Sequence, residues 1–230
     1  MKQSSVQLKT TLWVRLAAVS VILAIAACSP AGQQTSSLAT PITVTEAPTQ
    51  AASTPDLYVG DLVNPPVQLQ DFTMPSSTGE DMSLSDLDGQ WRMIFFGYLH
   101  CPDFCPLTLA EYRQVKALLG EDAEQIKFLY ISVDGLRDTP ESMRAYLNNF
   151  DPEFIGFSGD DETLESIQSD YGFYYRRQMN TSSQAIYIVD HSTRSYLVNP
   201  SGQLVASFTY DAEPRAIASA IQWHMQQTGI

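Results

Sequence analysis

The sequence predicts an α/β domain with a central mixed sheet and flanking helices, and three observations lead to this prediction. A segment with apolar side chains at helical spacing stands between two continuous apolar runs, which are typical of strands buried on both faces. Two shorter apolar segments flank the turn Pro200-Ser201-Gly202, as expected of a β-hairpin. An amphipathic helix closes the chain. In chain order these segments are residues 91–98, 107–119, 126–133, 195–199, 204–208 and 213–227.

The remaining segments complete the predicted order of elements. Thr139 suits a helix N-cap and Pro140 suits the first helical position after it. We expect short strands at 68–74 and 153–157, and helices at 139–150 and 161–171. A right-handed βαβ unit, then a hairpin and a closing helix, with two cysteines at the first strand-to-helix junction, is the order of the thioredoxin fold. We therefore predict a thioredoxin-like fold.

Residues 1–27 are interpreted as a lipoprotein signal peptide. Three basic side chains precede an apolar core at 16–27, which is of the usual length for a signal peptide and too short for a transmembrane helix. The leader ends Ala26-Ala27-Cys28, so we expect Cys28 to be lipidated and to become the mature N-terminus. An ordinary cleavage site that happens to precede a cysteine is the alternative.

Residues 28–64 are expected to be the lipidated cysteine and a disordered tether. Between residues 29 and 55, 23 of 27 residues are Ser, Thr, Pro, Gln, Ala or Gly. This segment therefore has too few large apolar side chains to form a core. Such a tether reaches roughly 30 Å. We expect residues 65–230 to form one domain, held by its lipid anchor on the extracytoplasmic side of a bacterial cell membrane.

The charge balance narrows the range of partners. The whole chain has a formal net charge of −13, and loss of the leader leaves 10 Lys and Arg against 26 Asp and Glu, a net −16. Such an acidic protein is a poor ligand for nucleic acid or for an anionic lipid surface. The charge suits cations and basic protein partners.

Two of the three cysteines, Cys101 and Cys105, stand at the predicted junction between strand and helix. Their spacing brings both sulfurs to one side of a helical turn, and the positive end of the helix favours the thiolate form. Outside the cytoplasm, thiols tend to oxidise, so an isolated pair is expected to be redox-active or to hold a metal. The pair alone is compatible with disulfide exchange, peroxide reduction or metal binding.

His191 favours the metal. It precedes the hairpin strand, at the place where thioredoxin-fold oxidoreductases carry a cis-proline, and no proline lies between Pro152 and Pro200. Two thiolates and one imidazole form a soft three-coordinate set that suits Cu(I) and can also hold Cu(II). A structural zinc site would normally have a fourth protein ligand.

Three motifs resemble those of the Sco/SenC family. They are Phe-Gly-Tyr-Leu-His-Cys-Pro-Asp-Phe-Cys-Pro at 96–106, Ile-Ser-Val-Asp with Arg-Asp-Thr-Pro-Glu at 131–141, and Val-Asp-His-Ser with Tyr-Leu-Val-Asn-Pro at 189–200. Two departures are small: Leu99 replaces a usual threonine, and Gly135-Leu136 replaces a usual Pro-Glu pair.

The resemblance covers nearly all of residues 65–225 and implies a membrane-tethered, thioredoxin-like copper chaperone rather than an enzyme. It places the copper ligands on Cys101, Cys105 and His191. It implies delivery of copper to the copper A site of cytochrome c oxidase. It also implies two kinds of partner. One is the oxidase subunit that bears this site, and the other is a periplasmic copper chaperone or thiol reductant.

Two other functions remain open at the level of sequence. An extracytoplasmic thiol-disulfide reductase that keeps the acceptor cysteines reduced would need both thiols but not His191. A peroxidase of the peroxiredoxin kind would need an arginine beside its reactive cysteine, and Arg92 is the nearest in sequence before Cys101.

Several other charged or ionisable side chains are expected to have roles other than metal binding. Asp134, Arg137 and Asp138 are expected to order the loop over the site without binding metal. His224, in the last helix, is expected to interact with the helix dipole. The arginine pair 176–177 stands out in so acidic a chain and is expected to contact a partner.

Overall fold

The structure is a computed structural model, and it describes residues 58–178 and 187–228. The expected signal peptide, the lipidation site at Cys28 and most of the expected tether lie outside the described residues. Within the described ranges, no helix has both the length and the apolar character that crossing a membrane requires.

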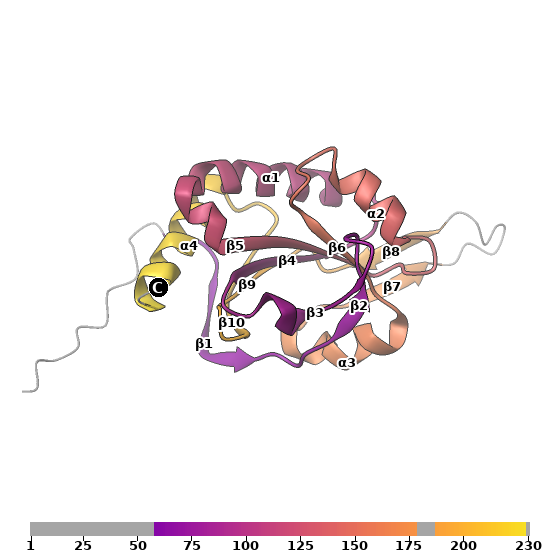
Figure 1. Cartoon of the computed structure of the whole chain (residues 1–230), viewed down its shortest axis with the longest axis horizontal. Coiled ribbons are helices and arrows are strands. Elements are labelled where there is room, and N and C mark those ends of the chain that lie inside the picture. Colours follow the sequence, from indigo (N-terminus) through magenta and orange to yellow (C-terminus); the bar gives the residue numbers. More distant parts are fainter. Residues whose placement is uncertain (1–57, 179–186, 229–230) are drawn as a thin grey trace, which may run out of the picture. The chain divides into compact units, whose positions relative to one another are not determined.

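A six-stranded mixed sheet forms the centre of the domain, in the order β1-β10-β9-β4-β5-β6 (Figure 1). Strands β4, β5 and β6 run parallel, whereas β9, β10 and β1 continue the sheet by antiparallel pairing. The strands are β1 Asp61–Gln68, β4 Trp91–Gly97, β5 Ile126–Ser132, β6 Ile155–Ser158, β9 Ser195–Val198 and β10 Gln203–Phe208. The predicted α/β class with a central mixed sheet is confirmed.

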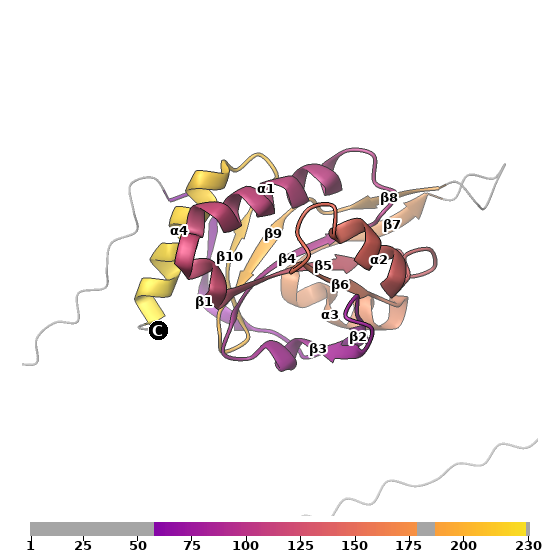
Figure 2. The same ribbon diagram turned by 45° about the horizontal axis from the view of Figure 1, so that its top comes forward.

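Helices cover both faces of the sheet. Side chains of α1, α2 and α4 belong to one buried cluster, and those of α3 belong to the cluster on the opposite face. The two views show α1 and α4 together on one side and α3 on the other (Figures 1 and 2). The helices are α1 Phe104–Leu119, α2 Pro140–Leu147, α3 Asp161–Tyr171 and α4 Pro214–Thr228, with short 3-10 helices at Leu84–Leu87 and Gly120–Gln125.

Two small hairpins complete the fold. Strands β2 (Thr73–Pro75) and β3 (Asp81–Ser83) pair with each other beside the main sheet. Strands β7 (Tyr175–Gln178) and β8 (Ile188–His191) form a second antiparallel pair. The second hairpin ends at His191, so it brings one of the predicted ligands back toward the sheet.

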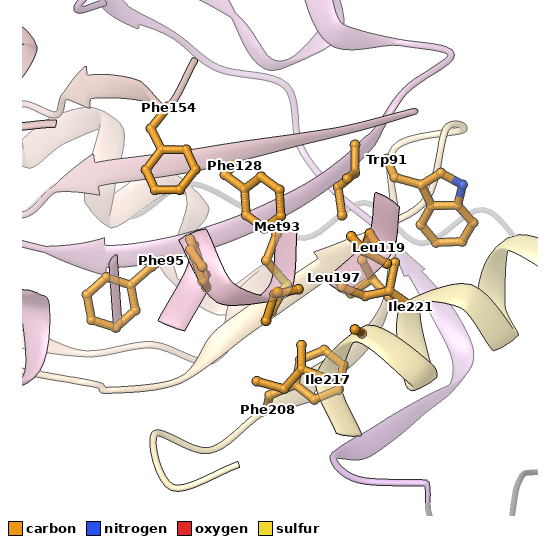
Figure 3. Close-up of a cluster of buried hydrophobic side chains, with 14 of the residues drawn as sticks. Trp91, Met93, Phe95, Leu119, Phe128, Phe154, Leu197, Phe208, Ile217 and Ile221 are labelled. Atoms are coloured by element: carbon orange, nitrogen blue, oxygen red, sulfur yellow. The ribbon is translucent and has the colours of Figure 1, made fainter. Parts of the chain in front are cut away.

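Strand β4 is buried on both faces, as its continuous apolar sequence predicts. Met93 and Phe95 point into the cluster under α1 and α4, while Ile94 and Phe96 point into the cluster on the other face. Figure 3 shows the first cluster, in which side chains from β4 and β5 meet side chains from α1 and α4. Full burial of each such side chain contributes about 1.5–3 kcal/mol. This packing fixes β4, and with it the start of the cysteine loop.

Some predicted boundaries differ from the structure. The strand expected at 68–74 is wrong: β1 ends at Gln68, and Leu69 and Phe72 are buried in the connection that covers one face of the sheet. Strand β1 begins at Asp61, ahead of the domain boundary expected at residue 65. Its mostly exposed side chains and two prolines hide it in the sequence, because its pairing with β10 comes from the backbone.

The role expected for His224 is wrong. Its side chain is buried, packs against Trp223, and lies 3.0 Å from the Tyr58 hydroxyl through Nε2. Burial lowers the pKa of His224 from 6.5 to about 4, so the ring is neutral at neutral pH and cannot act as a cation at the helix end. The histidine instead anchors Tyr58 to α4.

This burial predicts a pH dependence of stability. Because the pKa of His224 is lower in the folded chain, unfolding takes up a proton below pH 6.5, and stability falls as the pH drops toward 4. After allowance for solvent screening, the wild type should lose about 1–2 kcal/mol more between pH 7 and pH 5 than His224→Gln. Urea unfolding at both pH values measures the difference. Equal losses in both proteins would contradict the assignment.

Candidate metal centre

The cysteine loop connects the end of strand β4, at Gly97, to the start of helix α1, at Phe104. The backbone N–H of Cys101 donates to the carbonyl of Tyr98 at 3.2 Å, which closes a turn directly after the strand. Cys101 is half-buried in this loop, and Cys105 is buried in the first turn of α1. The structure therefore places the two thiols at the strand-to-helix junction, as predicted.

His191 lies against the thiols. Its Nε2 is 3.6 Å from the sulfur of Cys105, and one donor atom from each of Cys101, Cys105 and His191 lies within 4.8 Å of the others. Among the described residues, these three form the one group of at least three Cys, His, Asp or Glu side chains close enough to share a metal ion. Two sulfurs and one imidazole nitrogen are a soft donor set that suits Cu(I) better than a hard cation.

The orientation of the imidazole leaves one nitrogen for a metal. Nδ1 of His191 lies 2.8 Å from the carbonyl oxygen of Ser192, an acceptor, so Nδ1 carries the proton and donates it. Nε2 is then unprotonated and faces the sulfurs. Phe95 and Tyr98 hold the ring edge-on, with centroids 5.9 and 5.7 Å away. The partner of Nδ1 is thus the backbone of Ser192 and not the neighbouring carboxylate of Asp190.

A clamp of polar side chains ties the hairpin of His191 to the body of the domain. Asp134 is fully buried, accepts from Nε of Arg137 at 2.5 Å and also accepts from the hydroxyl of Tyr187. The guanidinium of Arg137 lies 3.6 Å from the ring centroid of Tyr187 and donates to its carbonyl at 3.3 Å. We call Asp134, Arg137 and Tyr187 the hairpin clamp. It confirms the loop-ordering role predicted for Asp134 and Arg137.

Asp138 orders the other side of the site. Its carboxylate is buried and accepts from the backbone N–H of Leu99 at 2.9 Å and from the hydroxyl of Ser132 at 2.7 Å. These bonds fix the start of the cysteine loop to the end of strand β5. The predicted structural role of Asp138 is confirmed.

The partner-contact role expected for Arg177 is wrong. Its guanidinium donates twice to Asp161, at 2.8 Å each, and once to the carbonyl of Val133 at 3.2 Å, and only 15% of the side chain is exposed. Arg177 therefore ties β7 to α3. Arg176 has a side chain that is 75% exposed, and its contact with a partner stays a prediction.

The two thiols have opposite acidities. Hydrogen bonds from the Cys105 thiol and from nearby backbone N–H groups lower the pKa of Cys101 to about 3. Burial, together with the negative charge of Cys101, raises the pKa of Cys105. The metal-free pair is thus an accessible thiolate beside a buried thiol. A metal bound by both sulfurs must displace the proton of Cys105.

The arginine considered for a peroxidase does not reach the thiols. Arg92 is fully buried near the start of β4, pairs with Asp88 at 2.6 Å and donates to the carbonyl of Asn199 at 3.1 Å. The cysteine loop follows the other end of that strand. Arg92 therefore cannot activate Cys101.

The site opens into a cavity of about 220 Å³. Tyr98, Phe104, Tyr174 and Ile188 line it together with the thiol of Cys101 and the ring of His191. Tyr174 and Ile188 are more than half exposed. Tyr98 and Phe104 belong to the motif at 96–106, whereas Tyr174 and Ile188 lie outside the three motifs, so the sequence does not show that they line the site.

The comparisons with known proteins agree with this geometry. Residues 63–226 match the family described as SCO1/SenC. A SCO2-like protein of Rickettsia felis is 30% identical over 147 residues, which is 64% of this chain and 72% of that protein. The human mitochondrial SCO1 homologue is 33% identical over 157 residues, or 67% of this chain, which spans about half (52%) of that longer protein.

Solved structures of similar proteins include forms with copper bound. Copper-bound ScoI of Bradyrhizobium japonicum is 33% identical, with a TM-score of 0.61 over 68% of this chain and 98% of that one. Copper-bound yeast Sco1 is 26% identical, with a TM-score of 0.62 over 70% of this chain and 90% of that one. The family match covers more than half of the sequence, and the predicted thioredoxin-like fold is confirmed by these neighbours. The chain therefore belongs to the SCO1/SenC family.

Proposed function

We propose that this protein binds copper through Cys101, Cys105 and His191 and delivers it to the copper A site of cytochrome c oxidase. The observation that carries the proposal is the convergence of three soft donors from two distant segments, with the imidazole held in the tautomer that offers Nε2. Membership of the SCO1/SenC family, and copper in solved structures of similar proteins, support the same metal. The protein would act as a metallochaperone rather than as an enzyme.

The difference between the two thiols suggests an order of events. Cys101 is already a thiolate and lies toward the cavity, so it takes the incoming Cu(I) first. Cys105 then releases its proton to solvent and binds as the second thiolate, and His191 completes the set. Delivery also begins at Cys101, because thiolates of the acceptor can reach the copper from that accessible side, and buried Cys105 releases the copper last and takes up a proton again. Copper remains Cu(I) throughout this exchange of ligands, so no electron is transferred.

The proposal includes attachment to the membrane. Lipidation of Cys28, followed by the tether that ends before strand β1, would hold the domain on the extracytoplasmic side of a bacterial membrane, near a membrane-bound oxidase. The net negative charge of the chain suits a basic face on the oxidase subunit that receives copper. Other copper chaperones or thiol reductants outside the cytoplasm would load or reduce the site.

The proposed ligand set predicts graded losses of copper binding. In a competition titration of the full chain against a chromophoric Cu(I) chelator, Cys101→Ser should abolish tight binding. His191→Ala should weaken binding by about 100-fold or more, because a ligand is lost, and loss of a ligand's hydrogen-bond partner alone already costs about 10- to 100-fold. His100→Ala is the matched control, since this imidazole is 60% exposed and is not among the three grouped donors. Unchanged affinity in His191→Ala would contradict the proposed site.

One observation favours a second function, an extracytoplasmic thiol-disulfide reductase. An accessible Cys101 thiolate beside a buried Cys105 thiol is the arrangement that attacks a disulfide and then resolves the mixed disulfide. An oxidase-assembly complementation assay separates the two. A reductase would keep its activity in His191→Ala, whereas a copper chaperone would lose it.

A further inference from the structure

Tyr130 carries a buried hydroxyl that the fold leaves unpaired. It lies within strand β5, none of its surface is exposed, and its hydroxyl has no hydrogen-bond partner among the described residues. Burying such a group without a partner costs stability, so an orphan hydroxyl in a tightly packed core calls for a physical reason. The groups that surround the Tyr130 hydroxyl indicate what this reason is.

The hydroxyl faces the buried sulfur of the candidate metal centre. A Cβ built on Gly97 would lie 2.7 Å from the hydroxyl of Tyr130 and 2.8 Å from the sulfur of Cys105. Both polar groups therefore border the same small space beside Gly97, at the end of strand β4. The parallel register sets Tyr130 opposite Phe95, whose ring packs against it at 6.0 Å. The absence of a side chain at residue 97 is what lets the phenol approach the thiol.

The chemistry of the two groups depends on whether the sulfur is charged. A neutral thiol is a weak acceptor, whereas a thiolate, free or bound to a metal, is a strong one. Burial raises the pKa of Tyr130 well above its usual range, so the phenol remains a donor. The hydroxyl is thus available, protonated and beside a sulfur that becomes anionic when a metal is bound.

We propose that Tyr130 is a positioning residue that donates a hydrogen bond to the sulfur of Cys105 when this sulfur binds copper as a thiolate. The inference rests on the proposed copper site. The bond would fix the direction of the sulfur lone pairs and draw electron density away from the copper. A hydrogen bond from the same hydroxyl to a neutral thiol would be weaker, because a thiol sulfur is a poor acceptor.

The proposal predicts opposite effects of Tyr130→Phe on the metal-free and copper-loaded forms of the full chain. Without metal, the thermal unfolding midpoint should be unchanged or higher, because an orphan hydroxyl is removed. The affinity for Cu(I), from chelator competition, should fall about tenfold. The sulfur-to-Cu(II) charge-transfer band should move to longer wavelength, because the sulfur loses a hydrogen bond that stabilises its electrons.

Tyr171→Phe is the matched control. Tyr171 is also buried with an unpaired hydroxyl, but it lies in the cluster on the opposite face of the sheet. This variant should keep wild-type copper affinity and an unshifted band.

Three outcomes would overturn the inference. Wild-type affinity and an unshifted band in Tyr130→Phe would show that the hydroxyl does not reach the bound sulfur. A large fall in the metal-free unfolding midpoint would assign Tyr130 to packing. Wild-type protein that bound no copper would overturn the proposed function and this inference together, and that result is distinct from the first two.

Discussion

Replacing Gly97 by alanine is expected to weaken Cu(I) binding by more than about 100-fold. The new Cβ would lie 2.8 Å from the sulfur of Cys105, 2.7 Å from the hydroxyl of Tyr130 and 2.9 Å from the ring of Phe95, all of them in a closed core. Since none of these groups has free space, the sulfur must leave the position from which it meets Cys101 and His191. Overpacking of this kind also costs about 1–3 kcal/mol of stability.

Gly156→Ala separates the two effects. Its Cβ would press on the side chains of Met143 and Leu147 under helix α2, with a closest approach of 2.6 Å, and would touch neither thiol. Both variants should unfold at lower urea concentration than the wild type, but only Gly97→Ala should lose copper affinity in a chelator competition. Equal copper affinities in the two variants would show that the sulfur position does not depend on Gly97.

Removal of the clamp arginine has the second largest expected effect. Arg137→Ala would leave the fully buried carboxylate of Asp134 without its closest cation and would strip the stacked guanidinium from Tyr187. We expect a loss of about 3 kcal/mol in the free energy of unfolding, at the low end for a broken buried ion pair, because Arg177 stays 3.6 Å from the Asp134 carboxylate. Copper affinity should also fall, because the hairpin that presents His191 is no longer held.

Arg176→Ala serves as the control on the same hairpin. Its side chain is 75% exposed and meets Asp190 at 3.4 Å, so its removal should change stability by less than about 0.5 kcal/mol. Urea unfolding and chelator competition on both variants provide the comparison. If Arg137→Ala were as stable as Arg176→Ala, the clamp would have no structural role.

The parts of the fold that the sequence predicts are those with a strong local signal. Strands β4 and β5 are continuous apolar runs, and the β9–β10 hairpin has the turn Pro200-Ser201-Gly202 between its strands. Strand β7, with the sequence Tyr-Arg-Arg-Gln, has no such signal. It forms because its backbone pairs with β8 and because Arg177 reaches Asp161 and Val133, and neither contact can be read from the segment itself.

The same distinction holds for the site. Cys101, Cys105 and His191 could be found because each belongs to a recognisable motif and because soft donors at those places have a shared chemistry. Tyr130 lies outside the three motifs. Gly97 belongs to the first of them, but the sequence does not show its contact with Tyr130, because that contact depends on packing between two neighbouring strands. The error at His224 has a related cause: the sequence shows a histidine in a helix, but not that the fold buries it.

X-ray absorption at the copper edge, on full chain loaded with one Cu(I), tests the central claim most directly. The account predicts two sulfur ligands and one imidazole in the wild type, with the scattering of the imidazole ring lost in His191→Ala. A wild-type copper bound by sulfur alone, or an imidazole signal that survives His191→Ala, would contradict it.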